Sequence, residues 1–388
     1  MIHKLTNGRV ILGNVIKDGL SVYTKDNRIL AVTDEKLPCD VLHDAKGGYI
    51  SPGFIDIHVH GGGGREFRDG REEDFIAISE LHAKHGTTTL LPTASAVSTE
   101  SYVNMFEAFR RVKASDNPHG AYMPSIHMEA PYFAPSQVGA QGPYIRGYDR
   151  AEYTMLIEKY GDLICRWSAA PELEGAKDFA RVCRENGIRL SIGHSDAEYD
   201  CVMEMYNEGF DCVTHLYSCT STVHRKNAYR YAGIVEAAYM IDGMDVELIA
   251  DGKHLPASLL RFAVKHKGID RICIITDATR CAGLPDGAEK MFENPGFIIE
   301  DGVAKLPDRS AFSGSVCTTN RLVRNMRDMA GVSLADAVRM ASANPARVAG
   351  LRDRGTLREG AFADLVIFDE NIDVSFTMVN GRVVYAAE

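Results

Sequence analysis

The chain has 388 residues, of which 45% are hydrophobic and 25% are charged, and its formal net charge at pH 7 is -10. These values are typical of a globular protein with a large core. The acidic balance and the lack of a Lys/Arg-rich run argue against a nucleic-acid surface, and no window approaches the roughly 18 apolar residues of a membrane span.

The first residues, "MIHKLTNGRV", contain neither an apolar stretch nor a small-residue cleavage site, so they do not resemble a signal peptide. The nine cysteines are scattered and form no CxxC pair. We therefore expect reduced thiols and a cytoplasmic protein.

Both ends of the chain have the character of antiparallel β-structure. Residues 1 to 50 contain short apolar runs separated by the turn signals KDG and KDN. The segment "ADLVIFDENIDVSFTMVNGRVVY" contains Asn380-Gly381, a strong signal for a two-residue hairpin. We predict that residues 1–52 and 350–388 form one small β-sandwich domain.

The middle of the chain, residues 53–349, alternates short apolar runs with amphipathic helical stretches that close on glycine. The eight expected strands are "FIDIH", "TTTLLP", "MPSIHME", "ICRWSAA", "RLSIGH", "CVTHL", "VELIAD" and "ICIITD". Eight such units favour a parallel (β/α)8 TIM barrel. An open doubly wound sheet is less favoured, because "HGGGGREF" after the first strand is not the phosphate-binding GxGxxG pattern.

Polar side chains follow the expected strands where an α/β barrel builds its active site. They are His58 and His60, Glu129, His194, His215, Asp251 with His254, and Asp277. Because alternate residues of a strand share one face, His58 and His60 point the same way. Imidazole and carboxylate groups converging on one rim predict a metal site, and they suit zinc but also iron, manganese or nickel.

A metal at such a rim favours hydrolysis of an amide, since it polarises a carbonyl and lowers the pKa of water. The reaction also needs a group that takes a proton from water and returns it to the leaving amine, and Asp277 has the position and chemistry for this. His254 is the best neutral donor to the developing oxyanion.

Eight motifs in order over nearly the whole chain resemble the amidohydrolase superfamily, and within it the N-acetylglucosamine-6-phosphate deacetylase family. They are "PGFIDIHVHG", "HMEAP", "GHSDA", "THLYS", "ADGKH", "TDAT", "FSGS" and "NPARVAGL…GTLREGAFADLVIFD". The resemblance implies a metal-bearing barrel and a homodimer that hydrolyses the N-acetyl amide of an amino-sugar phosphate. N-acetylglucosamine 6-phosphate and N-acetylgalactosamine 6-phosphate are the expected substrates.

The resemblance also implies roles for individual residues. Glu129, His194 and His215 would bind the principal metal, with Asp277 as general base and acid and His254 in contact with substrate. Some family members bind a second metal through a histidine pair after the first strand. His58 and His60 would then hold a second ion bridged by Glu129, and the alternative is a single ion with two spectator histidines.

The chain departs from the family pattern where the substrate is recognised. "EAP" replaces "E-G-P" at Ala130. "VGAQ" stands where many members have "K-G-A-H", so Ala140 is kept and Gln141 replaces a substrate-contacting histidine. "HLYSCT" places Ser218 and Cys219 where an Asn-Ala pair is usual. The family's phosphate-binding arginine, which reaches into the neighbouring subunit, corresponds best to Arg225, with Arg230 as the alternative. These departures indicate a retained deacetylase centre with altered sugar recognition.

Two other functions remain open at this point. One is another amidohydrolase reaction, such as hydrolysis of a cyclic amide or an N-acyl amino acid, or a deamination. The other is a non-catalytic barrel that acts as a scaffold, which is disfavoured because every candidate ligand and Asp277 are present.

Overall fold

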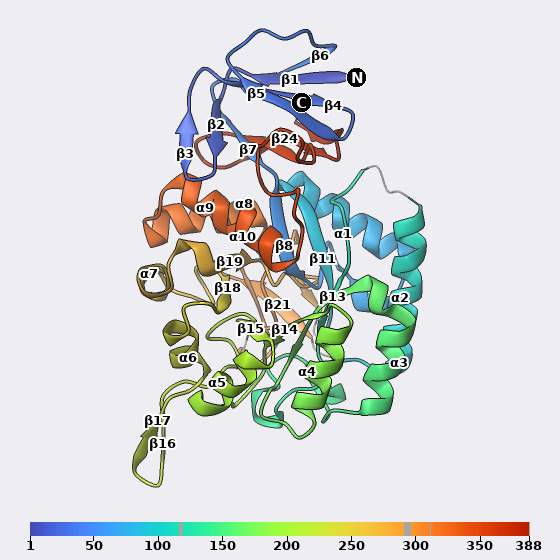
Figure 1. Ribbon diagram of the computed structural model, residues 1–388, viewed down its shortest axis with the longest axis vertical. Coiled ribbons are helices and arrows are strands. Elements are labelled where there is room, and N and C mark those ends of the chain that lie inside the picture. Colours follow the sequence, from blue (N-terminus) through green and yellow to red (C-terminus); the bar gives the residue numbers. More distant parts are fainter. Residues whose placement is uncertain (116–118, 291–295, 311, 388) are drawn as a thin grey trace.

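The computed structural model describes residues 1–115, 119–290, 296–310 and 312–387. Glu388, the last residue of the predicted β domain, lies outside the described part. A β domain at one end contains both chain termini, and a barrel of strands and helices forms the rest of the molecule (Figure 1).

Eight strands form one parallel sheet in the order in which they occur along the chain. They are β8 (Phe54–Val59), β11 (Thr87–Ala94), β12 (Ile126–Glu129), β13 (Ile164–Ala169), β14 (Arg189–Ile192), β15 (Phe210–Val213), β18 (Asp245–Ile249) and β19 (Ile272–Ile275). The ring closes next to β8, where Val59 bridges Ala278 and the amide of Asp277 donates to the carbonyl of His58 at 3.0 Å. The predicted (β/α)8 barrel and its eight strands are confirmed.

A helix follows each barrel strand and covers its outer side, as a right-handed crossover requires. These helices are α1 (Glu72–Lys84), α2 (Thr99–Ala114), α3 (Arg150–Tyr160), α4 (Ala176–Glu185), α5 (Tyr199–Asn207), α6 (Ile234–Met240), α7 (Ala257–Lys267) and α8 (Thr319–Asn325). Ser98 and Asp149 cap α2 and α3 by accepting hydrogen bonds from backbone amides of the first turn. The short helices α9 (Leu334–Met340) and α10 (Ala343–Val348) lead back to the β domain.

Two packed sheets built from both ends of the chain form the β domain. One sheet has the order β5-β4-β1-β6, from β5 (Arg28–Thr33), β4 (Ser21–Lys25), β1 (Ile2–Thr6) and β6 (Val41–Asp44). The other has the order β25-β24-β23-β7-β2-β3, from β25 (Arg382–Ala386), β24 (Val374–Val379), β23 (Leu365–Phe368), β7 (Tyr49–Pro52), β2 (Arg9–Leu12) and β3 (Val15–Lys17).

An apolar cluster fills the space between these sheets, with Leu5 and Val22 from one and Ile50 and Met378 from the other. Val379 pairs with Arg382, so the predicted hairpin at Asn380-Gly381 is present. The small β-sandwich from both termini is confirmed, while its exact boundaries at residues 52 and 350 stay a prediction.

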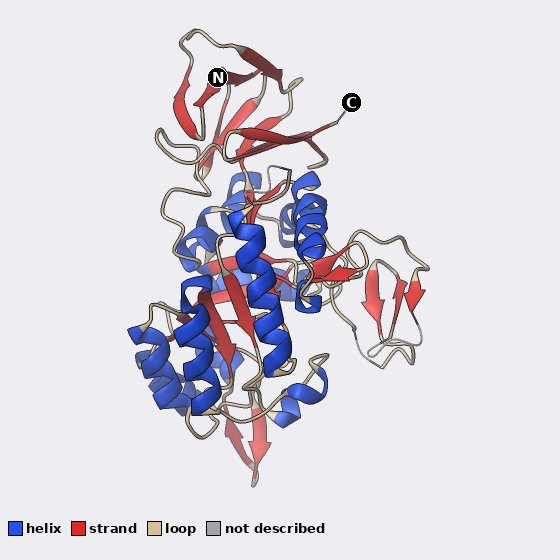
Figure 2. Cartoon of the chain, turned by 90° about the vertical axis from the view of Figure 1, so that its right-hand side faces the viewer, coloured by secondary structure: helices blue, strands red, loops and turns tan. Residues whose placement is uncertain are grey.

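Three excursions leave the barrel at the carboxyl ends of its strands. β9 (Gly61–Gly62) and β10 (Arg65–Glu66) form a tight hairpin after β8. β16 (His224–Lys226) and β17 (Tyr229–Tyr231) form a hairpin that projects from the bottom of the molecule in both views (Figures 1 and 2). β20 (Glu289–Lys290), β21 (Phe297–Glu300) and β22 (Val303–Lys305) form a small sheet that stands out on the right of Figure 2.

None of the helices in the described ranges combines the length and the apolar character needed to cross a bilayer.

Candidate metal centre

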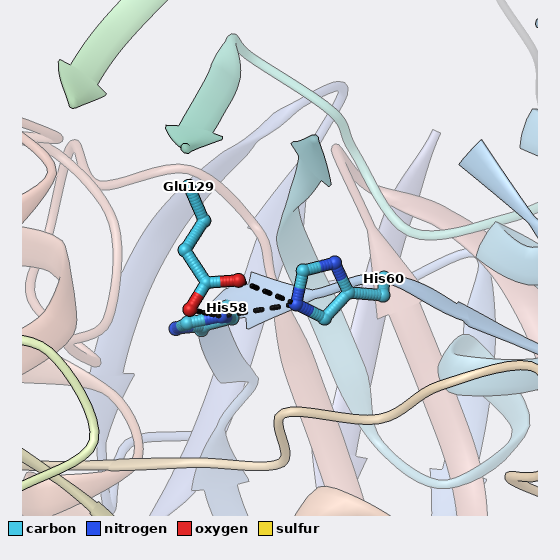
Figure 3. A group of neighbouring side chains, drawn as sticks. All are labelled: His58, His60 and Glu129. Carbon is cyan, nitrogen blue, oxygen red and sulfur yellow. Dashed lines mark hydrogen bonds and ion pairs between the residues drawn. The ribbon is translucent and has the colours of Figure 1, made fainter. Parts of the chain in front are cut away.

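The polar residues predicted at the strand ends converge on one point of the barrel rim. Three overlapping groups of potential ligands, each with ligand atoms within 4.8 Å of one another, lie there. They are His58, His60 and Glu129; Glu129, His194 and His215; and His58, His215 and Asp277. Glu129 belongs to two of these groups, and Figure 3 shows its carboxylate facing both His58 and His60.

The backbone turns abruptly at three of these residues. β14, β15 and β19 end two residues before His194, His215 and Asp277, whereas the sequence predicted strands running through them. All three have positive φ angles, of 49°, 30° and 47°. Such backbone conformations are uncommon for residues other than glycine and are often found at functional sites. The turn ends the strand and leaves the side chain at the rim.

Distances between the ligand atoms match those around a bound divalent cation. The Nε2 atoms of His58 and His60 are 3.2 Å apart, and Nε2 of His60 lies 3.0 Å from Glu129. Nε2 atoms of His194 and His215 lie 3.3 and 2.7 Å from Oε1 of Glu129. Bonds of about 2.0–2.1 Å to a tetrahedral zinc ion place its ligand atoms roughly 3.3 Å apart. The residues present therefore fit a divalent metal.

In three of these histidines Nδ1, the ring nitrogen that faces away from the site, has a hydrogen-bond partner. Nδ1 of His194 lies 2.7 Å from the carbonyl oxygen of Gln137, and Nδ1 of His215 lies 3.2 Å from that of Ser218. A carbonyl only accepts, so in both rings Nδ1 carries a proton, and in the neutral ring Nε2 would turn its lone pair toward a bound cation. Nδ1 of His58 lies 3.1 Å from Glu247. This arrangement is typical of metal-binding histidines.

The buried carboxylates of the centre favour positive charge beside them. Burial alone would lower the pKa of His60 and His194, but contacts with carboxylates and, at His194, with Cys219 raise these values to about 9 and about 10. Burial likewise opposes ionisation of Asp277, yet the charges of His58 and His60 lower its pKa to about 2. In this structure the negative charge of the buried carboxylates is balanced by protonated imidazoles. A metal cation bound to neutral histidines would balance the same charge.

Asp277 and His254 follow the neighbouring strands β19 and β18, beside the principal ligand set. Oδ1 of Asp277 is 3.4 Å from His58 and 3.3 Å from His60. Asp251 accepts hydrogen bonds from the backbone and from Nδ1 of His254, the latter at 2.7 Å. Burial disfavours the charge on His254, but Asp251 raises its pKa above the usual value. Nε2 of His254 is thereby turned to the pocket.

A pocket of about 340 Å³ opens over the centre. The described residues that line it include Ala140, Gln141, Ser218, Cys219 and His254, all predicted to contact substrate. Arg225 and Arg230 are not among them, since they are exposed and paired with each other on the projecting hairpin.

Gln141 lies deeper in the site than the sequence indicated. It is buried, donates from Nε2 to Glu129 at 2.6 Å and accepts from the amide of Ala96 at 2.8 Å. Its side chain therefore braces the central carboxylate as well as lining the pocket. Ala130, where the family pattern has glycine, has a φ of 118°, a conformation that favours glycine.

Sequence reasoning missed a buried ion pair beneath the centre. Arg166 of β13 and Glu247 of β18 are both fully buried and pair inside the barrel, and Glu247 also contacts His58. The sequence feature that could have revealed this pair is a charged residue inside each of two apolar runs, "ICRWSAA" and "VELIAD". Sequence reasoning also missed Glu66, Arg68 and Arg280, which line the pocket; no motif marked them.

Comparison with known proteins agrees with this geometry. The model of the amidohydrolase family matches residues 49–384. The chain is 31% identical to an N-acetylglucosamine-6-phosphate deacetylase of Lysinibacillus sphaericus, covering 94% of this chain and 93% of that protein. It is 30% identical to an N-acetylgalactosamine-6-phosphate deacetylase of Escherichia coli O157:H7, covering 98% and 99%. A crystal structure of N-acetylglucosamine-6-phosphate deacetylase from Pasteurella multocida superposes with a TM-score of 0.91 at 26% identity, covering 99% of each chain.

Proposed function

The chain belongs to the amidohydrolase family, and from this premise we propose that it removes the acetyl group from an N-acetyl amino-sugar 6-phosphate. The products are acetate and the amino-sugar phosphate. Relatives at about 30% identity over nearly the full length carry this activity in their names, for N-acetylglucosamine 6-phosphate and for N-acetylgalactosamine 6-phosphate. The observation that carries the proposal is the convergence of Glu129, His194 and His215 with Asp277 at one rim.

Glu129, His194 and His215 would hold the principal ion, and His58 and His60 a second one that shares Glu129. We propose zinc, because imidazole and carboxylate donors at these spacings suit it. When bound, a divalent cation polarises the amide carbonyl and lowers the pKa of water.

The chain's own residues move the proton. Asp277 takes a proton from the attacking water as the bond from water oxygen to the carbonyl carbon forms, and it returns this proton to nitrogen as the carbon–nitrogen bond breaks. His254, whose Nδ1 donates to Asp251, donates from Nε2 in its protonated form to the carbonyl oxygen as negative charge develops there. The nitrogen of the amino sugar therefore leaves as a neutral amine.

Substrate recognition is assigned to the wall that bears Ala140, Gln141, Ser218 and Cys219. We also propose a homodimer, as the resemblance implies, and a cytoplasmic location, as the scattered cysteines suggest. In that dimer the projecting hairpin, with Arg225 or Arg230, would extend toward the neighbouring subunit.

An acetate-release screen tests the proposal. Purified protein loaded with zinc is given 6-phosphorylated and unphosphorylated N-acetylhexosamines, and its metal content is measured on the same sample. We expect acetate from at least one phosphorylated N-acetylhexosamine and one or two ions per chain. Release of no acetate from any of them, with metal bound, would contradict the proposal, and release of ammonia from a nucleobase would favour a deaminase instead.

A further inference from the structure

The pocket contains two arginines that neither the motifs nor the mechanism uses. Arg68 lies in the short 3-10 helix η1 (Phe67–Asp69), directly after β10. Arg280 follows β19 and Asp277. Because β8 and β19 are neighbours where the barrel closes, both guanidinium groups belong to one wall of the pocket, next to His60 and Asp277.

Glu66 ties the two arginines together. Its carboxylate accepts from Nη2 of Arg280 at 2.9 Å and also pairs with Nε of Arg68. Burial disfavours its charge, but the hydrogen bond from Arg280 and the charge of Arg68 hold the pKa of Glu66 below its usual value. Asp69 adds a second carboxylate near both arginines, so the geometry of the guanidinium groups, and not a net charge, favours an anion at this wall. The described residues that line the pocket include no lysine.

Arg68 is oriented so that its terminal nitrogens are available. Only Nε is engaged by Glu66, and in the described part of the chain Nη1 and Nη2 have no hydrogen-bond partner. The side chain is 22% exposed and lines the pocket, so it is held in place yet open to the cavity. Because Glu66 holds Nε, the planar guanidinium is fixed with Nη1 and Nη2 available to donate. Two such donors match an oxyanion that accepts two hydrogen bonds.

This wall differs from the one that carries the expected sugar contacts. Ser218 and Cys219 follow β15, which is separated from β8 by β18 and β19 on one side of the ring. Arg225 and Arg230 are exposed on the hairpin beyond them. An oxyanion bound within one subunit therefore has its available guanidinium donor at Arg68, with Arg280 beside it.

We propose that Arg68, supported by Arg280 and Glu66, forms an oxyanion subsite that binds the acidic group of the substrate within a single subunit. The inference rests on the proposed function, because it places that group in the deacetylase pocket. Its ligand is a phosphate monoester or a carboxylate carried by the amino sugar, since both accept two parallel hydrogen bonds from a guanidinium.

Binding of reaction-product analogues tests this subsite without requiring turnover. Isothermal titration calorimetry on the metal-loaded protein compares glucosamine with glucosamine 6-phosphate and with muramic acid, which carries a carboxylate. We expect one of the acidic sugars to bind about 10- to 100-fold more tightly than glucosamine, as charge-assisted hydrogen bonds imply. The acidic sugar that shows this preference identifies the ligand chemistry. Equal binding of all three would overturn the subsite.

Variants then show which residue causes the preference for an acidic sugar over glucosamine. Arg68→Gln is expected to remove most of it, and Arg68→Lys to retain part, because lysine keeps the charge but loses the fork of donors. Arg65→Gln is the matched control, since Arg65 lies on β10, directly before η1, but pairs with Asp74 at 2.5 Å. It should bind like the wild type, and the melting temperatures of all variants report whether they are folded.

Kinetics separate this inference from the proposed function. With an acetylated 6-phosphate as substrate, Arg68→Gln should raise KM about tenfold or more while kcat changes little. If Arg68→Gln keeps the preference and Arg225→Gln loses it, the anion is bound by the hairpin and the subsite is wrong. If no acetate is released but the preference depends on Arg68, the deacetylase proposal fails and the subsite stands.

Discussion

The barrel and the β domain both bury an ion pair, but in different places. The pair of the β domain, Arg354 with Asp364, lies beside Tyr122 and outside the cluster between its two sheets. Between the two terminal sheets the packing is apolar, with Leu5, Val22, Ile50 and Met378 at its centre. The barrel interior instead buries charge: Arg166 and Glu247 have no exposed surface and pair directly below His58.

The difference separates stability from chemistry. Apolar burial stabilises a fold without fixing the orientation of any one group. A buried ion pair contributes little net stability, because desolvation offsets most of the attraction, but it holds its partners in one geometry. The apolar cluster therefore contributes stability to the β domain, and the buried pair in the barrel orients His58. Substitutions in the two regions should differ accordingly.

The largest effect on catalysis is expected at the principal ligands. His194→Ala should abolish both metal binding and acetate release, because it removes a ligand from the three-residue set around Glu129. Elemental analysis and activity on the same sample measure this. Full metal content and normal turnover in the variant would remove His194 from the centre.

Asp277→Asn should have the next largest effect on catalysis. We expect kcat to fall roughly 10²- to 10⁴-fold, the usual contribution of a general acid–base group. Metal content should stay near that of the wild type, because Glu129, His194 and His215 are unchanged. Single-turnover kinetics with elemental analysis check both parts. A variant that keeps its kcat would show that another group moves the proton.

Glu247→Gln sharpens the comparison within the barrel. Loss of the carboxylate leaves the buried Arg166 unpaired, which costs about 3–5 kcal/mol of unfolding free energy. It also loosens His58, so affinity for the second ion should drop by about 10- to 100-fold. Denaturant unfolding and metal titration measure the two effects. Unchanged metal affinity together with lost stability would limit the pair to a structural role.

Ile50→Ala in the β domain should have the smallest effect on catalysis. Ile50 is fully buried between the sheets, so its truncation should cost about 2–5 kcal/mol of stability. kcat/KM of the folded enzyme should equal that of the wild type. A matching loss of kcat/KM below the melting transition would show that the β domain also shapes the active site.

Much of the molecule could be read from local patterns. Alternating apolar runs and amphipathic stretches predicted all eight barrel strands, and Asn380-Gly381 predicted its hairpin. Barrel geometry then placed His58, Glu129, His194 and Asp277 on one rim, since parallel strands present their carboxyl ends together. Ligand residue types at those ends were enough to predict a metal site.

Residues whose partners lie far along the chain escaped this reasoning. Glu247 reads as one charge in a strand, and its contact with His58, 189 residues away, exists only in the closed ring. Gln141 was expected at the substrate, whereas its amide braces Glu129. Arg68 has no motif, and its place in the pocket depends on how the β9–β10 hairpin folds over the rim.

The sequence by itself determined the class of fold, the family and the chemical type of the ligands, because these depend on periodicity and on residue types at strand ends. Only the tertiary structure decided which buried pair supports the histidines, which amide braces Glu129 and which arginines face the cavity. Those relations arise from closure of the barrel, which brings β19 back beside β8 and joins side chains separated by more than 200 residues along the chain.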